Sequence, residues 1–300
     1  MSGPLRAVSR LAADLAAGRF VVTSEVVPPA SARLGAFFRR AAALSRFARA
    51  ITVTNNHGGT AQLGSLTAAG LLVRQGIEPI WVCITRDQNR LAIESDLISA
   101  EALDVRNILC LRGDEFPEGV KAKPVHDLGT FGLIRLVAAR RDAGAPFFVG
   151  AAVDLNSVPA ERAAEQAARR VEAGAEFLLT QPVYEAERVE AFLEALRPRL
   201  SRPVWLLPGM MPLLSRDAVE RVPGRLRIVI AEHILSRIRE AADPKREGLA
   251  VFAETLRALR SIRGVHGVNL MLFGFRPDIA EEVRATIATV IQTTPYVGAR

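Results

Sequence analysis

Side chains capable of chemistry recur in this 300-residue chain where short apolar runs end. Glu25 closes one such run and is followed by two valines and two prolines. A carboxyl group in apolar surroundings is poorly solvated, which raises its pKa and suits it to act as a general acid. The alternative is a structural glutamate that forms an ion pair with a nearby arginine.

The tripeptide Arg112-Gly113-Asp114 follows another apolar run and combines three properties of a ligand site. An arginine can hold a phosphate group through two hydrogen bonds, and a glycine lets the backbone approach a ligand closely. The aspartate can accept hydrogen bonds from a polar heterocycle. The alternative is a turn with a local ion pair. Gln181, at the end of a further run, offers the paired donor and acceptor that would suit a ring edge.

Several reaction classes lack the residues that they require. A Schiff-base enzyme needs a lysine on a strand, but the three lysines lie in loops or near predicted helix starts. The four histidines form no HxH or HExxH motif, and no GxSxG motif is present, so we expect neither a metal site nor a serine hydrolase. An isolated acid, an aspartate, a glutamine and several arginines suit an organic cofactor that supplies the difficult chemistry.

The elements that must position these residues are eight β-rich apolar runs separated by amphipathic stretches. The runs begin near Phe20, Ala50, Pro79, Asn107, Phe147, Phe177, Val204 and Gly267. Residues 160–172 and 185–196 have the three-to-four spacing of apolar residues that is typical of helices. Because the runs are almost continuously apolar, they indicate strands covered on both faces, and alternation with helices indicates parallel pairing.

Eight such units predict a (β/α)8 TIM barrel, with its active site at the C-terminal ends of the strands. We expect an extra N-terminal helix at about residues 7–17 and extra helices near residues 229–240 and 246–260, before the last strand. Residues 1–300 are predicted to form one catalytic domain. The alternative is an open doubly wound sheet, although no GxGxxG turn follows any of the runs.

Composition narrows the class of protein further. The chain is 49% hydrophobic and 24% charged, with a net charge of +7 scattered among acidic residues, so we expect no nucleic-acid partner. Cys83 and Cys110 lie in apolar runs and are predicted to be buried thiols in a reducing compartment. No run reaches the roughly 18 to 20 residues of a membrane-spanning helix, and the first 20 residues do not form a secretory signal. We expect a cytoplasmic homo-oligomer with no membrane contact.

The same run ends resemble the methylenetetrahydrofolate reductase family of one-carbon metabolism. The match extends over roughly residues 18 to 290, and LRGD after a strand is quite specific when combined with the upstream ExxPP and the downstream AGAxxxxTQ. The matching segments are SEVVPP (24–29), ITVTNN (51–56), TRDQNR (85–90), RNILCLRGD (106–114), KPVHDL (123–128), FFVGAAVDLN (147–156), RRVEAGAEFLLTQPVYE (169–185) and LLPGMMPL (206–213).

The resemblance implies a flavoprotein oxidoreductase that reduces 5,10-methylenetetrahydrofolate to 5-methyltetrahydrofolate, a step in methionine biosynthesis. It implies that Glu25 is the general acid that protonates N10 of the folate as the five-membered ring opens. Asp114 matches the carboxylate that hydrogen-bonds the pterin and stabilises the resulting cation. Gln181 matches the pterin-binding glutamine. Hydride would come from the reduced flavin.

The resemblance also implies which residues contact the cofactor, FAD in preference to FMN. The positions assigned to cofactor binding at the strand ends and beyond are Thr54, Asn55, Arg112, Gly113, Asp114 and Arg170, the last in place of a lysine. Arg86 and Asn89 lie where the diphosphate or ribose could run. His126 and Asp127 fall in the segment that lines the adenosine side.

Three positions differ from the family pattern. Val82 stands where some members have a flavin-contacting histidine, and Ala218 and Val222 lie near the glutamine and phenylalanine of NADH-using members. A valine cannot stack on a nicotinamide ring. The electron donor is therefore either NAD(P)H or a partner protein such as a flavoprotein, a ferredoxin or a zinc subunit. The alternative function is a non-catalytic or differently reacting flavin- or folate-binding subunit of a one-carbon enzyme complex.

Overall fold

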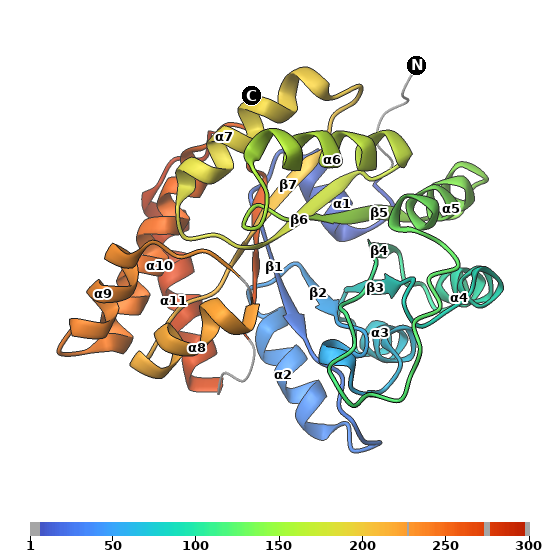
Figure 1. Ribbon diagram of the computed structural model, residues 1–300, viewed down its shortest axis with the longest axis horizontal. Coiled ribbons are helices and arrows are strands. Elements are labelled where there is room, and N and C mark those ends of the chain that lie inside the picture. Colours follow the sequence, from blue (N-terminus) through green and yellow to red (C-terminus); the bar gives the residue numbers. More distant parts are fainter. Residues whose placement is uncertain (1–6, 227, 273–276, 298–300) are drawn as a thin grey trace.

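The computed structural model describes residues 7–226, 228–272 and 277–297. Within them, eight parallel strands form a closed barrel in which each strand pairs with the next and β8 pairs with β1 (Figure 1). The strands are β1 (Val21–Val26), β2 (Ala50–Val53), β3 (Pro79–Ile84), β4 (Asn107–Leu111), β5 (Phe148–Val153), β6 (Phe177–Pro182), β7 (Trp205–Met210) and β8 (Gly267–Leu270). The predicted (β/α)8 barrel is confirmed, and the open-sheet alternative is wrong because β1 and β8 are paired.

Each strand begins within one residue of its predicted start. The prediction succeeds because the strands are buried on both faces and their sequences are therefore continuously apolar. Phe273, the last residue of the eighth predicted run, lies outside the described residues.

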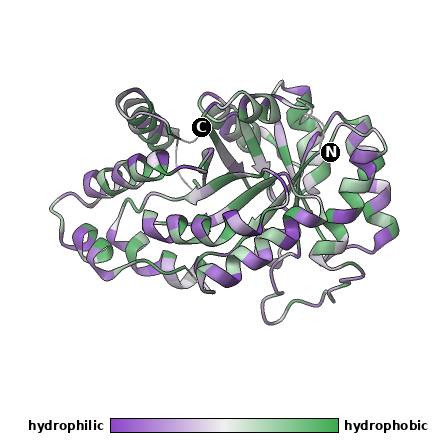
Figure 2. Cartoon of the chain, turned by 90° about the horizontal axis from the view of Figure 1, so that it is seen from above, coloured by the Kyte–Doolittle hydropathy of each residue, from purple (hydrophilic) through white to green (hydrophobic). Residues whose placement is uncertain are grey.

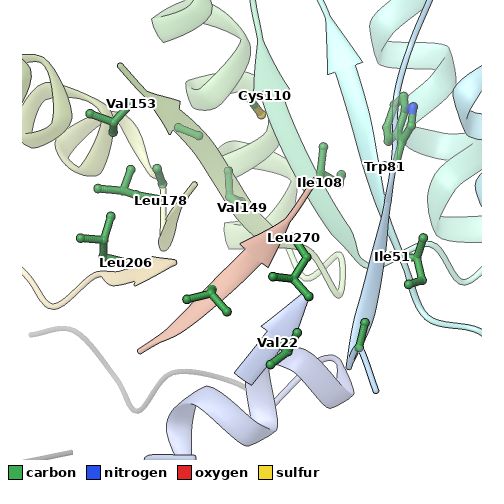
Figure 3. Close-up of a cluster of buried hydrophobic side chains, with 14 of the residues drawn as sticks. Val22, Ile51, Trp81, Ile108, Cys110, Val149, Val153, Leu178, Leu206 and Leu270 are labelled. Carbon is green, nitrogen blue, oxygen red and sulfur yellow. The ribbon is translucent and has the colours of Figure 1, made fainter. Parts of the chain in front are cut away.

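Side chains alternate along each strand between two separate apolar clusters. One cluster lies between the strands and the helices, and Figure 3 labels members of it on every strand, including Val22 on β1 and Ile51 on β2. The other cluster fills the barrel interior and includes Val21, Ala50 and Leu109. Since neighbouring residues of a strand point to opposite faces, membership of these clusters shows which way each remaining strand residue points.

Helices surround the barrel, and in Figure 2 they carry both hydrophobic and hydrophilic residues, as elements with one buried and one exposed side do. The helices that follow the strands are α2 (Gly35–Ser45), α3 (Ser65–Arg74), α4 (Arg90–Ala102), α5 (Thr130–Asp142), α6 (Ala160–Ala173), α7 (Ala186–Leu196) and α11 (Pro277–Thr293), with short 3-10 helices η1 (His57–Gly59) and η2 (Arg197–Arg199). Helix α6 ends as predicted at Gly174, whose φ of 131° suits a glycine.

The N-terminal helix α1 (Arg10–Ala16) closes the N-terminal end of the barrel. Its Leu11 and Leu15 are buried in the interior cluster. The carboxylate of Glu78, just before β3, accepts hydrogen bonds of 2.9 Å from the backbone N–H groups of Arg10 and Leu11. A carboxylate stabilises a helix N-terminus, so Glu78 fixes α1 in place. A ligand must therefore approach from the C-terminal end.

The long segment between β7 and β8 holds α8 (Arg216–Leu226), α9 (Glu232–Glu240) and α10 (Pro244–Ser261). The two predicted extra helices are confirmed as α9 and α10, and α8 was not predicted. These helices bury a satellite apolar cluster that includes Val219 and Ile238. Ala218 and Val222 are partly buried against it.

The two cysteines are fully buried, as predicted, and occupy paired positions of β3 and β4. Burial raises the pKa of both thiols. His266 accepts a hydrogen bond from the backbone N–H of Leu206, and burial lowers its pKa to about 4, so it is a neutral structural residue. The described helices include none with the length and apolar character needed to span a membrane.

Candidate active site

Glu25 points into the barrel near the C-terminal end of β1. Its neighbour Val26 belongs to the cluster under the helices, whereas Val21, four residues before Glu25, belongs to the interior cluster. Alternation therefore directs the Glu25 side chain inward. The residue is only 8% exposed.

The carboxyl of Glu25 has neither a hydrogen bond nor an ion pair with any of the described residues. Burial alone raises its pKa from 4.5 to about 8. The group is therefore mainly protonated at neutral pH, the state that a general acid requires. The raised pKa expected from the sequence is confirmed. The alternative, an arginine partner, is not found in the part of the chain that the structure describes.

Gln181 and Asp114 lie at the same end of the barrel. Gln181 lies at the C-terminal end of β6 and is exposed although its strand neighbours are buried. The pairing of β6 with β7 is irregular between Leu179 and Pro182. Asp114 follows the end of β4 by three residues and is exposed. The topology thus brings the three predicted catalytic residues to one mouth, from β1, β4 and β6.

Arg86 joins three of the loops around this mouth, although it is only 1% exposed. Its Nη1 donates a hydrogen bond of 2.8 Å to the backbone oxygen of Asp114, and its Nε donates one of 2.6 Å to Asp87. Its Nη2 reaches the backbone oxygen of Asn56 at 3.4 Å, and the guanidinium lies 4.4 Å from the centre of the Phe116 ring. Arg86 is thus committed to protein acceptors, and its contact with a diphosphate or ribose stays a prediction.

Gly113 and Arg112 illustrate two different requirements. Gly113 has a φ of +90°, and a Cβ atom there would lie 3.0 Å from Cβ of Arg86. Only glycine fits this close approach. Arg112 is largely exposed and forms an ion pair of 2.9 Å with Glu115, so the local ion pair considered as the alternative is present. An exposed pair of this kind is easily exchanged for a ligand.

Four further predicted residues already have structural partners. Asn89 caps α4 by accepting from the N–H of Ala92, and Asp127 accepts from the N–H of Arg90 at 2.8 Å. His126, next to Asp127 in the chain, adopts a φ of +44°. Thr54 and Asn55 follow β2. Their side chains donate to backbone oxygens at 3.4 and 3.3 Å, respectively. The cofactor roles of all five residues stay predictions.

Comparison with known proteins identifies the family. The sequence profile of methylenetetrahydrofolate reductase matches residues 10–274. The chain belongs to the methylenetetrahydrofolate reductase family. This confirms the resemblance seen in the sequence.

One related protein matches part of the chain. A Caenorhabditis elegans protein described as a probable methylenetetrahydrofolate reductase (NADPH) is 28% identical over 176 residues, which are 57% of this chain. The chain spans only 26% of the length of that relative.

Two solved structures show the same fold. An uncharacterized protein from Clostridium thermocellum that binds two copies of 5-methyl-5,6,7,8-tetrahydrofolic acid has a TM-score of 0.66 at 13% identity, covering 94% of this chain and 99% of its own. A tryptophan synthase from M. tuberculosis has a TM-score of 0.52 at 11% identity, covering 95% and 99%. At these identities the likeness concerns the barrel alone.

Members of the methylenetetrahydrofolate reductase family are flavin-dependent, and Arg170 tests whether FAD fits this chain. Its Nε and Nη1 atoms are buried and meet no acceptor among the described residues. Burial, and then the neighbouring Arg169, lower the pKa of Arg170. Its guanidinium lies 5.7 Å from the centre of the Phe131 ring, at the first turn of α5. A half-buried cation without a counter-charge fits an anionic group such as the diphosphate of FAD.

Sequence reasoning missed the polar residues that line the interior below the mouth. Thr23, Thr52 and Asn269 all point inward and are at most 2% exposed. Alternation counted back from Glu25 would have found Thr23, and counting back from Thr54 would have found Thr52. The stacking partner of Arg86, Phe116, gives no such signal because it lies in an irregular loop.

Proposed function

We propose that this chain reduces 5,10-methylenetetrahydrofolate to 5-methyltetrahydrofolate, with FAD as cofactor and Glu25 as general acid. The family assignment supports the reaction. The observation that carries the assignment of the acid is the buried, inward-facing carboxyl of Glu25, which has no partner among the described residues and has a pKa of about 8. A group that is protonated yet close to its pKa can release a proton readily at neutral pH.

Glu25 acts on the folate at N10. The protonated carboxyl donates its proton to N10 as the bond between N10 and the bridging methylene carbon breaks. The carboxylate that remains is largely buried, which favours its reprotonation after the reaction.

Asp114 and Gln181 hold the pterin. The exposed Gln181 amide supplies a donor and an acceptor for the edge of the ring. The Asp114 carboxylate stabilises the positive charge that develops when the five-membered ring opens. Arg86 acts indirectly, because its hydrogen bond to the backbone oxygen of Asp114 fixes the loop that carries the carboxylate.

FAD, when bound, supplies the hydride that completes the reduction. The residues that would hold it are Thr54, Arg112, Gly113 and Arg170. Of these, Arg170 offers the unpartnered cation and Gly113 the close backbone approach. The electron source upstream of FAD is NAD(P)H or a partner protein. Since Ala218 and Val222 pack against the satellite cluster of α8 to α10, neither offers an aromatic surface for a nicotinamide.

A non-catalytic folate-binding subunit is the competing reading. It would not explain Glu25, because a buried carboxyl without a partner destabilises the fold and a binding surface has no need of its proton. The two are separated by an anaerobic assay with reduced viologen as artificial donor and 5,10-methylenetetrahydrofolate as substrate, on protein whose cofactor has been identified by absorbance and mass. We expect FAD and formation of 5-methyltetrahydrofolate. Folate binding without turnover in the FAD-loaded protein would support the subunit instead.

A further inference from the structure

We propose that Thr52 is the positioning residue of Glu25. The two side chains are not hydrogen-bonded to one another in this structure. A change of side-chain rotamer would let the Thr52 hydroxyl accept a hydrogen bond from the protonated carboxyl and donate one to the carboxylate left after proton transfer. The catalytic part of this inference rests on the proposed function.

The register of the barrel brings the two residues side by side. In the parallel pairing of β1 with β2, Glu25 is the direct partner of Thr52. Ile51 and Val53 face the helices, so Thr52 faces the interior, as Glu25 does. Neighbouring strands lie about 4.8 Å apart, which puts the two side chains in contact range of one another.

Thr52 is an exception among the buried hydroxyls of this region. It is 2% exposed, and its Oγ1 is buried without a partner in the described ranges of the chain. Thr23, one inward position below Glu25, donates to Oδ1 of Asn269 at 2.9 Å. Ser24 donates to the backbone oxygen of Leu270 at 2.9 Å. Because buried polar groups are nearly always hydrogen-bonded, the unpartnered Thr52 hydroxyl calls for an explanation.

Glu25 is the neighbour able to bond this hydroxyl after such a change of rotamer, because it lacks what Thr52 offers. Its carboxyl is also without a partner, and a general acid changes during its reaction from a hydrogen-bond donor to an acceptor. A hydroxyl can follow this change by rotating, since it is both acceptor and donor. A backbone amide or an arginine, which only donates, could bond the carboxylate but not accept from the carboxyl.

The side chains around Glu25 allow an effect of Thr52 on the ionisation of Glu25 to be measured. On β8, the other strand paired with β1, the inward neighbour is Asn269, which is bonded to Thr23. On β2 the next inward residue is Thr54, whose hydroxyl Oγ1 lies 3.4 Å from the backbone oxygen of Val26. Neither side chain titrates, and burial is the sole cause of the raised pKa of Glu25. A change at Thr52 is therefore read directly in the ionisation of Glu25.

The test uses Thr52→Val, which removes the hydroxyl at constant shape, and Thr52→Ser, which keeps it. The titration of Glu25 is followed in the folate-free protein by infrared difference spectroscopy, using the carbonyl stretch of the protonated carboxyl that Glu25→Gln removes. A hydrogen bond to a carboxylate is stronger than one from a neutral carboxyl. We therefore expect Thr52→Val to raise the midpoint by about half a pH unit, and Thr52→Ser to leave it unchanged.

Thr23→Val is the matched control, because Thr23 also faces inward but is bonded to Asn269 instead. It should leave the Glu25 midpoint where it is in the natural chain. Thr52→Ala repeats the measurement with a smaller side chain in case the valine disturbs packing. The proposal is overturned if folded Thr52→Val or Thr52→Ala titrates like the natural protein, or if Thr52→Ser shifts as Thr52→Val does.

Turnover provides the catalytic arm of the test. We expect Thr52→Val to lower kcat roughly 3- to 10-fold, the worth of one neutral hydrogen bond, and Thr52→Ser to restore it. In a Glu25→Gln background, Thr52→Val should have no further effect. An equal loss in both backgrounds would contradict the proposal. The infrared titration needs no turnover, so it tests the pair of residues even if folate reduction itself is not found.

Discussion

Nη1 of Arg86 lies 2.8 Å from the backbone oxygen of Asp114, and this hydrogen bond joins the end of β3 to the loop that follows β4. The arginine is almost fully buried, with its charge balanced by Asp87. The position of Asp114, which the proposed reaction needs beside the pterin, is thus set by a cation that does not touch its carboxylate. Arg86 therefore contributes both to the stability of the fold and to the position of a proposed catalytic residue.

The first prediction concerns that coupling. Arg86→Gln leaves Asp87 without its partner and frees the loop, so the free energy of unfolding should fall by about 3 kcal/mol. Arg112→Gln is the matched control, because its ion pair with Glu115 is exposed and should be worth less than about 1 kcal/mol. Urea unfolding of both variants measures the difference. Equal losses would show that Arg86 is not a structural centre.

The second prediction concerns pH. Because the pKa of Glu25 is raised from 4.5 to about 8, the folded state binds a proton that the unfolded state releases. Stability should therefore decrease as pH rises from about 4.5 to 8 and level off above that, with a total of up to about 5 kcal/mol. Glu25→Gln should remove this part of the dependence. Urea unfolding at pH 5, 7 and 8.5 gives the comparison, and parallel curves for the two proteins would contradict the raised pKa.

A third prediction tests the packing of the interior. A Cβ atom on Gly150 would lie 2.2 Å from the ring of Phe177, which itself stacks on Phe148 at 4.7 Å. Gly150→Ala should therefore destabilise the protein by about 3 kcal/mol. Gly224→Ala, in α8, meets no atom within 4 Å and should be neutral or stabilising by up to about 1 kcal/mol. A tolerated Gly150→Ala would mean that the interior is less tightly filled.

The fourth prediction separates stability from cofactor binding at Arg170. Its buried guanidinium atoms lack an acceptor, so Arg170→Met should stabilise the cofactor-free protein by about 1 kcal/mol and weaken retention of FAD. Arg162→Met, on the exposed side of α6, should change neither. Thermal unfolding and the flavin content after gel filtration provide the two readouts. Unchanged flavin content in Arg170→Met would remove this residue from the cofactor site.

The barrel could be predicted because each strand, covered on both faces, leaves a continuous apolar run in the sequence. Helix α8 could not, since Pro223 lies inside it and proline normally ends a helix. Its stability comes from the satellite cluster that it shares with α9 and α10, a contact between distant residues.

The candidate site likewise contains residues that the sequence predicts and residues whose surroundings only the fold determines. Glu25 could be predicted because its carboxyl ends an apolar run and the sequence shows the two valines and two prolines that follow it. Arg86 and Arg112 look alike in the sequence, each a polar residue after a strand. Only the fold of the β4–α5 loop, which brings the oxygen of Asp114 and the ring of Phe116 to Arg86, buries one and leaves the other exposed.

In the proposed reaction, the protonated Glu25 carboxyl delivers the proton that opens the folate ring. The most direct measurement is single-turnover reduction of 5,10-methylenetetrahydrofolate by the prereduced, FAD-loaded protein and its Glu25→Gln variant, with folate affinity measured in parallel. We expect similar affinity and a rate lowered by roughly 10²- to 10⁴-fold. A rate within a factor of about three of the natural protein would contradict it.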